Sequence, residues 1–217
     1  MIALQSPHAR FHDTFMEAHF EFRGEFRNAG GMWSAPACES GYPGISFSLA
    51  EMKTVEGFDR YCDWLVKDSL DATPRPVVQV PTTHLFITRG EQFLGSIHLR
   101  HWLTDFLSDM GGHISYSVRP SARGQGVASE ALRLALPRAR DLGLERVLIT
   151  TTTVNEASAK VIEHNGGVLE GVRRGMRRYW VEVSDLPDAA PRHERPDADD
   201  ARPSLTPMHD AIAARLG

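Results

Sequence analysis

The chain has 217 residues, of which 24% are charged, and a formal net charge of −4 at pH 7. This length is enough for one well-buried domain with a tail, and the lack of a basic block argues against general nucleic-acid binding. No run approaches the roughly 18 to 20 apolar residues that a membrane-spanning helix needs, so we expect no membrane partner.

The number of cysteines and the N-terminal segment indicate in which cellular compartment the protein works. The two cysteines, Cys38 and Cys62, are too few for a disulfide framework, and the chain begins without the basic and apolar segments of a secretory signal. We therefore expect a cytoplasmic protein. Histidines and cysteines nowhere show zinc-site spacing, so we expect no metal.

The N-terminal part of the chain predicts helices. Apolar residues recur at helical spacing over 11–27 and again over 52–70. Residues 28–45 are rich in Gly, Ala and Pro and are expected to form a loop, and residues 71–81 hold three prolines and read as a connector.

The middle of the chain predicts strands. Residues 84–88 and 93–99 flank a turn at 89–92, which is typical of a β-hairpin. The segment 101–112 carries an apolar stripe, which we expect to pack against the core or, as the alternative, to cover an acceptor. Residues 113–118 then alternate polar and apolar, as in a strand with two distinct faces.

A glycine turn follows that strand. It reads Arg-Gly-Gln-Gly-Val-Ala over residues 123–128 and leads into a helical pattern that extends to Leu142, with Pro137 expected to kink it and Gly143 to end it. A helix start offers unpaired N–H groups and the positive end of the dipole, and glycines let the backbone approach a ligand closely. The turn therefore predicts a phosphate-bearing cofactor, with a simple strand-to-helix connection as the alternative.

Two other phosphate motifs do not fit this turn. A P-loop needs a Lys-Ser/Thr pair after its second glycine, and a Rossmann fingerprint needs a third glycine and an acidic residue about 20 positions later. Gly126 is followed instead by Val127 and Ala128.

The C-terminal part continues with alternating strands and helices. A strand is expected at 146–151, then a helix capped by Asn155, then strands at 168–172 and 176–183. From residue 185 the composition shifts to Pro, Ala, Asp and Arg, so 185–217 is expected to be a disordered or weakly helical tail.

At this point the chain resembles the GNAT superfamily of acetyl-CoA-dependent N-acetyltransferases. The glycine turn matches the family signature Arg/Gln-x-x-Gly-x-Gly/Ala, and residues 155–158 and 161–166 look like the second signature. The phrase 99–121 is similar to a subgroup of predicted acetyltransferases with no settled substrate. The resemblance is strong over 84–183, weak over 1–83 and absent in the tail.

The resemblance implies a GNAT domain over 1–184, with acceptor-side helices in 1–83 and the acetyl-CoA-binding core in 84–183. The implied fold class is α/β (α+β): a curved, mostly antiparallel mixed sheet with helices on both faces. Strands 113–118 and 146–151 would run parallel and splay apart.

The resemblance also implies how acetyl-CoA binds. The pantetheine arm would pair with backbone groups near 116–118, and the diphosphate would lie on the amides of 124–128. Asn155 and Ser158 would contact the carrier, with helix capping as the alternative. The cofactor-binding residues predicted in this way are Val118, Arg123, Gly124, Gln125, Gly126, Val127, Ala128, Asn155 and Ser158.

For catalysis, an amine acceptor arrives protonated and must lose a proton. His113 is the first candidate for the base, with a structural histidine as the alternative, and His98 and His101 come next. A strand N–H near Ser117 is expected to stabilise the oxyanion. The family often places an acidic tyrosine where this chain has Ile162, so Tyr116 or Tyr179 would have to serve instead.

The sequence therefore predicts an acyltransferase that moves an acetyl group from acetyl-CoA to a primary amine of a small molecule or peptide. The alternative is a sensor module that binds acyl-CoA without turnover. The oligomeric state stays open, with a homodimer as one option.

Overall fold

The computed structural model describes residues 1–22, 33–35, 37, 42–76 and 78–186. Cys38 and the tail from residue 187 onward lie outside these ranges, so the predictions made for them are not addressed. In the described part, no helix has the length and apolar character that crossing a membrane requires.

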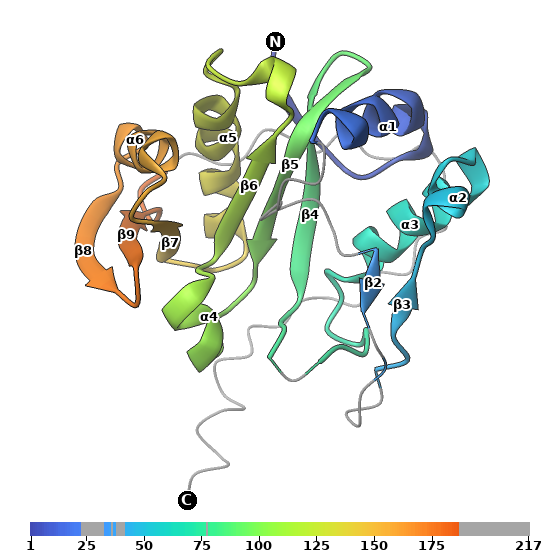
Figure 1. The fold of residues 1–217 in the computed structure, drawn as a ribbon. Helices are drawn as coiled ribbons and strands as arrows, with labels where there is room; N and C mark the ends of the chain where they lie inside the picture. Colours follow the sequence, from blue (N-terminus) through green and yellow to red (C-terminus); the bar gives the residue numbers. More distant parts are fainter. Residues whose placement is uncertain (23–32, 36, 38–41, 77, 187–217) are drawn as a thin grey trace, which may run out of the picture.

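The described helices and strands alternate along the chain (Figure 1). The helices are α1 (His12–Glu21), α2 (Leu49–Met52), α3 (Val55–Lys67), α4 (Asp105–Met110), α5 (Val127–Asp141) and α6 (Glu156–His164), with 3-10 turns η1 (Ala9–Phe11) and η2 (Pro120–Ala122). The strands are β1 (Ala3–Gln5), β2 (Ser34–Ala35), β3 (Ile45–Ser46), β4 (Thr82–Arg89), β5 (Gln92–Arg100), β6 (Ile114–Val118), β7 (Arg146–Thr152), β8 (Val168–Arg173) and β9 (Met176–Glu182).

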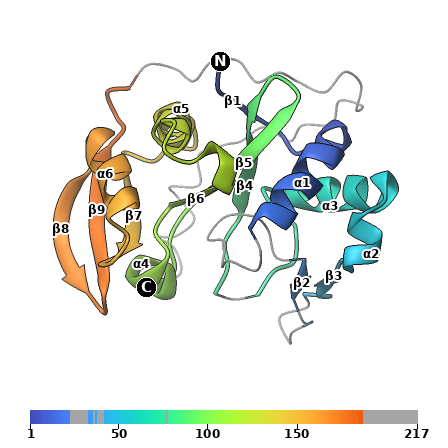
Figure 2. The ribbon, with the colours of Figure 1, turned by 45° about the horizontal axis from the view of Figure 1, so that its top comes forward.

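Two antiparallel sheets form the centre of the molecule. One has the strand order β1-β4-β5-β6 and the other the order β7-β9-β8, and β2 and β3 form a separate short pair. Helix α5 lies against one face of the first sheet, and α1 and α3 lie against the other (Figure 1, Figure 2). The predicted fold class, with helices on both faces of a mostly antiparallel sheet, is confirmed.

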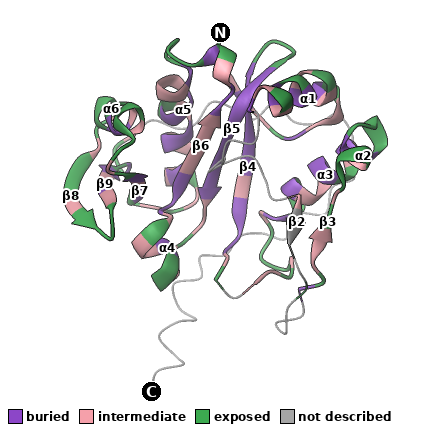
Figure 3. Ribbon diagram, in the orientation of Figure 1, coloured by how far each residue is buried: buried purple, intermediate pink, exposed green. Residues whose placement is uncertain are grey.

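Each face of the first sheet has its own hydrophobic core. The larger core joins α5 to that sheet and to β7 and β9 through residues such as Leu132, Ile97 and Tyr179. The smaller core is aromatic and joins α1 and α3 to Phe86 and Phe93. Buried positions accordingly line the inner sides of α5 and the central strands, whereas β8 is largely exposed (Figure 3).

The local signals place most elements near their predicted limits. Helix α5 runs through Pro137 without interruption and ends at Asp141. Leu142 is the C-cap residue, and Gly143 follows it with a φ of 84°, in the left-handed region that favours glycine. The hairpin β4–β5 forms, and Asn155 caps α6.

The predicted helix 52–70 forms as α3, over Val55–Lys67, and a short helix that was not predicted, α2, ends at Met52 just before it. Ser48 and Glu51 form a capping box that starts α2. Thr54 then accepts the Gly57 N–H and starts α3 as a new helix. A side chain at Gly57 would meet the Glu51 carbonyl oxygen at 2.1 Å, so the tight break between the helices depends on this glycine.

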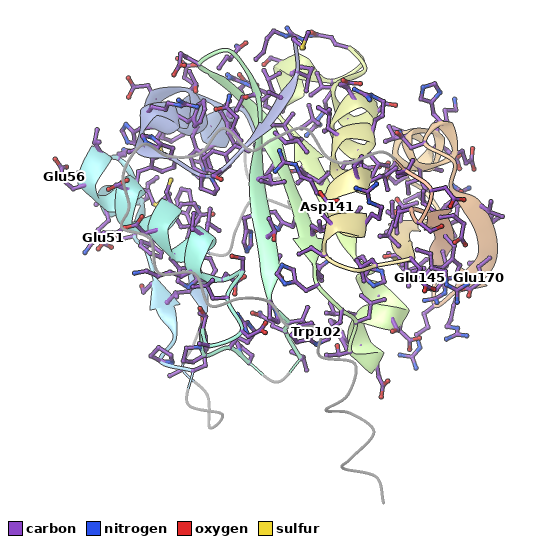
Figure 4. All side chains as sticks on the ribbon, turned by 180° about the vertical axis from the view of Figure 1, so that it is seen from behind. Glu51, Glu56, Trp102, Asp141, Glu145 and Glu170 are labelled. Carbon is purple, nitrogen blue, oxygen red and sulfur yellow. The ribbon has the colours of Figure 1, made fainter. Side chains whose placement is uncertain are left out.

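The segment 101–112 forms α4, and most of its apolar stripe is not packed. Only Leu107 is buried, whereas Trp102, Phe106 and Met110 are about half exposed. Trp102 lies near one end of the central sheet (Figure 4). The expectation that this stripe packs against the core is therefore met by one residue.

Candidate active site

The two sheets part between β6 and β7. Among the described residues these strands share one isolated bridge, between Gly112 and Ile149, and no ladder. The predicted parting of the two strands is confirmed, although the bridge that remains is antiparallel rather than parallel.

The open edge of β6 presents specific backbone groups. The His113 carbonyl and the Arg119 N–H both bond to β5, and bonding alternates along an antiparallel ladder. Residues 115 and 117 therefore also bond to β5, whereas the N–H and C=O groups of Tyr116 and the N–H of Val118 point away from it, toward the gap. The Val118 carbonyl also points away from β5 and accepts from Arg123 Nε. The oxyanion was expected to bind a strand N–H near Ser117, and the N–H groups there that face the gap are those of its two neighbours, Tyr116 and Val118.

The glycine turn gives α5 an N-terminus without a side-chain cap. Gly124 and Gly126 have φ values of 72° and 74°, in the left-handed region, and Gly126 is the N-cap residue. Since the N-cap residue Gly126 has no side chain to accept from the first turn, the N–H groups at the start of α5 keep their capacity to bind an anion. A Cβ at either glycine would meet no atom within 4 Å, so the space in front of the turn is open.

Two side chains of the turn donate hydrogen bonds to backbone carbonyls that precede it. Arg123 Nε donates to the Val118 carbonyl at 3.0 Å, and Gln125 Nε2 donates to the Ser121 carbonyl at 2.9 Å. These bonds join the end of β6 to the start of α5. The predicted contact of Arg123 with the cofactor stays a prediction.

Across the gap, α6 is tied to β6. The Ser158 Oγ and the Tyr116 hydroxyl are 2.9 Å apart, and Asn155 Oδ1 accepts the Ser158 N–H at 3.0 Å. Burial raises the pKa of Tyr116 to about 12, so its hydroxyl stays protonated at neutral pH. Asn155 therefore has the capping role, and the structure brings together Tyr116 and Ser158, which were predicted for different tasks.

His113 is held in a structural position at the base of the gap. Its N–H donates to the Leu148 carbonyl at 2.7 Å, and its ring Nδ1 accepts the Leu148 N–H at 2.8 Å. In the neutral ring Nε2 must then carry the proton, so no ring nitrogen has a free lone pair. Burial, with a contribution from Arg100, lowers the pKa of His113 to about 4. This geometry favours the structural alternative over the general base.

One important contact was missed by the sequence analysis. Arg119, 4% exposed, donates through Nε to Glu21 Oε1 at 3.0 Å, and the other oxygen of Glu21 accepts the Ser121 N–H at 3.1 Å. These bonds fasten the end of α1 to the loop before the glycine turn. Because Glu21 and Arg119 are 98 residues apart, no local pattern could have indicated the pair.

A separate cavity of about 570 Å³ lies between α5 and the ends of β8 and β9. Leu136, Val168, Trp180 and Leu186 are among its lining residues, and no residue of the glycine turn is. It is therefore distinct from the gap between β6 and β7.

A family model described as an acetyltransferase (GNAT) domain matches residues 33–168. The chain belongs to the GNAT acetyltransferase family. The resemblance on which the sequence prediction rested is thereby confirmed, and no curated protein matches the chain significantly.

Solved structures share the GNAT fold. RimJ from Mycobacterium smegmatis, in complex with a CoA disulfide, has 16% identity and a TM-score of 0.57, covering 87% of this chain and 85% of that one. The ribosomal-protein-S5-alanine acetyltransferase from Vibrio fischeri has 16% identity and a TM-score of 0.53, covering 86% and 94%. The microcin C7 self-immunity acetyltransferase MccE, with acetyl-CoA and AMP, has 14% identity and a TM-score of 0.51, covering 84% and 92%.

Proposed function

We propose that this GNAT protein transfers an acetyl group from acetyl-CoA directly to a primary amine of a small molecule or peptide. The observation that carries the proposal is the open edge of β6, which is followed at once by the glycine turn and the uncapped start of α5. Unpaired strand amides and an anion-binding helix end thus lie in series along a single stretch of chain.

Acetyl-CoA fits these groups part by part. The diphosphate accepts from the first amides of α5, at Val127 and Ala128, and the two left-handed glycines leave open space for it. The pantetheine arm pairs with the Tyr116 carbonyl and the Val118 N–H, which β5 leaves free. Asn155 and Ser158 lie at the start of α6, on the far side of the gap.

The reaction then follows from amine and thioester chemistry. The acceptor loses a proton, attacks the thioester carbon, and forms a C–N bond as the C–S bond breaks. The N–H groups of Tyr116 and Val118 are suited to bind the oxyanion. The thiol of the leaving group has a pKa of about 8.5, so it departs readily near neutral pH, and the Tyr116 hydroxyl is a hydrogen-bond donor on that side of the gap.

The related structures support the choice of acceptors to try. The Vibrio fischeri protein is named as an alanine acetyltransferase of a ribosomal protein, which supports the inclusion of peptide α-amines beside small amines.

Two measurements test the proposal. Calorimetry gives the affinity for acetyl-CoA, and thiol release with a panel of alkylamines and peptide amines gives turnover. Gly126→Glu is expected to weaken acetyl-CoA binding by at least about 100-fold, because a carboxylate would face the diphosphate. Gly143→Glu is the matched control, since Gly143 has a similar φ at the other end of α5 and also faces open space.

The outcomes separate the two functions. Tight binding with amine-dependent thiol release supports the enzyme, whereas tight binding without turnover on any amine would indicate the sensor. Equal affinities for the two glutamate variants would contradict the proposed diphosphate site.

A further inference from the structure

A row of polar side chains crosses the first sheet on the face opposite α5. His84 in β4 is the register partner of His98 in β5, and His98 is the partner of Ser115 in β6. Partners in antiparallel strands project from the same face, and Phe86, two residues after His84, packs into the aromatic core with α1 and α3. The three side chains therefore lie side by side beneath the acceptor-side helices.

The proton on His84 is positioned by an aspartate. Asp68, directly after α3, has its Oδ2 2.8 Å from His84 Nε2, and both residues are more than 90% buried. A carboxylate only accepts, so a neutral His84 ring holds its proton on Nε2 and leaves Nδ1 as an acceptor. Arg75 Nε lies 3.6 Å from the other carboxylate oxygen of Asp68.

Two buried atoms of this row have no hydrogen-bond partner among the described residues. These are His84 Nδ1 and Ser115 Oγ, which stand on either side of His98. An unpaired buried polar atom costs about 1–3 kcal/mol, and native proteins hold few of them. Two in one row indicate a place where a polar group from outside the described residues binds.

His98 lies between His84 and Ser115 in the register of the sheet. Its ring centroid is 4.3 Å from that of His84 at an interplanar angle of 67°, and its ring makes no hydrogen bond to a described residue. Burial, with contributions from His84 and Arg100, lowers the pKa of His98 well below 6.5, so at pH 7 the ring is neutral, with one lone pair and one N–H. Because such a ring by itself binds a proton weakly, the positive charge has to be held by the Asp68–His84 pair. Ser115 is adjacent to Tyr116, whose backbone faces the gap, so the row ends beside the proposed thioester.

The nearby charged groups are engaged elsewhere. Arg100 donates to the Gly112 carbonyl at 3.0 Å, and the Asp68 carboxylate is flanked by Arg75 and His84. Although aspartate and histidine are metal-binding residue types, no three such side chains among the described residues are placed to hold an ion. The row is therefore better suited to carry a proton than a metal.

We propose that this row, the amine relay (Asp68, His84, His98 and Ser115), takes the proton from the acceptor amine. His98 contacts the amine and accepts its proton at one ring nitrogen. In the amine complex the other ring nitrogen of His98 donates to His84 Nδ1, which has no partner among the described residues of the free protein, and its proton moves across this new hydrogen bond. His84 becomes an imidazolium paired with Asp68. The inference rests on the proposed function and deepens it, because it assigns the acceptor side of the same site.

All protons that the acceptor loses are accounted for. An ammonium acceptor gives up two protons on its way to the amide: the first enters the relay and later returns to water through His98, and the second ends on the sulfur of CoA. His98 is thus the catalytic residue, and His84 and Asp68 are positioning residues that act through it.

Matched acceptors test the relay kinetically. Benzylamine is an ammonium at pH 7 and must lose a proton, whereas aniline is already neutral and has no proton to lose before attack. In His98→Gln, His84→Gln and Asp68→Asn, kcat/KM for benzylamine and its homologues is expected to fall by about 10²–10⁴-fold. For aniline and its homologues it should fall by less than about 10-fold, and acetyl-CoA affinity should stay unchanged.

Exposed residues of the same types provide controls. His164→Gln in α6 and Asp71→Asn in the connector are expected to leave both rates unchanged. If the variants lose both acceptor classes equally, the row is only structural and the relay is wrong.

A spectroscopic measurement tests the relay without turnover. In ¹⁵N-histidine-labelled full-length protein at pH 7, His84 is expected to carry its proton on Nε2 alone, and Asp68→Asn should release this preference. A proton on Nδ1, or a charged His84 ring, would overturn the relay even if the enzyme is active. Conversely, if wild-type protein acetylates no amine, the proposed function fails, whereas the protonation of His84 in this spectrum still tests the relay separately.

Discussion

The contact of α1 with the loop before the glycine turn gives the sharpest stability prediction. Glu21 accepts from Arg119 and from the Ser121 N–H, and the hydrogen bond from Arg119, with help from Ser121, lowers the pKa of Glu21 from 4.5 to about 2. Replacing Glu21 by Gln removes the charge but keeps the shape. It also leaves the guanidinium of Arg119, which is 4% exposed, without its main counter-ion.

The magnitude follows from the pKa of the carboxylate. The pKa of Glu21 is about 2.5 lower in the folded protein, and each pKa unit is worth about 1.4 kcal/mol, so the difference corresponds to about 3.4 kcal/mol. The Glu21 side chain is 27% exposed, so solvent screening reduces this to about 2 kcal/mol. Because the folded-state pKa lies below the unfolded value, this stabilisation is complete above about pH 4.5 and is lost as the pH falls toward 2.

Urea denaturation between pH 2.5 and 7 measures the effect. Glu21→Gln is expected to lower the free energy of unfolding by about 2 kcal/mol at pH 7, or the Tm by about 4–8 °C, and to weaken its pH dependence below 4.5. The matched control is Glu17→Gln, whose carboxylate is 64% exposed and 3.5 Å from the same guanidinium, and it should cost at most about 0.5 kcal/mol. Equal midpoints and equal pH slopes for wild type and Glu21→Gln would refute the reasoning.

Three further substitutions probe the core and the gap. Leu132→Ala, at a fully buried position of α5, should lower the free energy of unfolding by about 2–5 kcal/mol in urea denaturation. Ser158→Ala removes the Oγ that is hydrogen-bonded to the Tyr116 hydroxyl, so the free energy of unfolding should fall by about 1 kcal/mol. A urea midpoint equal to that of wild type would argue against that bond. His113→Ala leaves the buried Leu148 N–H unpaired and should cost about 1–3 kcal/mol. Since the folded-state pKa of His113 is about 4, wild type loses stability as the pH falls from 6.5 toward 4, and this loss should disappear in the variant while kcat/KM at pH 7 is retained.

The sequence predicted those parts of the fold that local patterns encode. Alternation located β6, helical spacing located α5, and the glycines between them marked the helix start, because each signal depends on residues close in the chain. The parting of β6 from β7 came from the family resemblance. No pattern within either strand states which strand it fails to pair with.

Long-range contacts explain what the sequence could not predict. The backbone of Leu148 determines that His113 uses its Nδ1 as an acceptor, and Leu148 is 35 residues away. The sequence of a strand therefore does not distinguish a catalytic histidine on its polar side from a histidine that only holds a neighbouring strand in place. Likewise, nothing local distinguished Ser117, whose amide faces β5, from Tyr116, whose amide faces the gap.

The two faces of the first sheet differ in whether their buried side chains need hydrogen-bond partners and find them. Toward α5 the strands bury aliphatic residues that need no partner. Toward α3 the same strands bury His84 and His98, and Ser115 is partly buried with an unpaired hydroxyl, although apolar residues at these positions would be more stable. Natural sequences accept such local conflicts mainly at functional sites. The polar face should therefore be the side on which the acceptor amine binds, while β6 and α5 hold acetyl-CoA at the edge of the sheet. Replacing His98 by Leu tests this reasoning directly: the buried ring makes no hydrogen bond to a described residue, so the protein should unfold at a urea concentration no lower than that of wild type, yet acetylate alkylamines poorly.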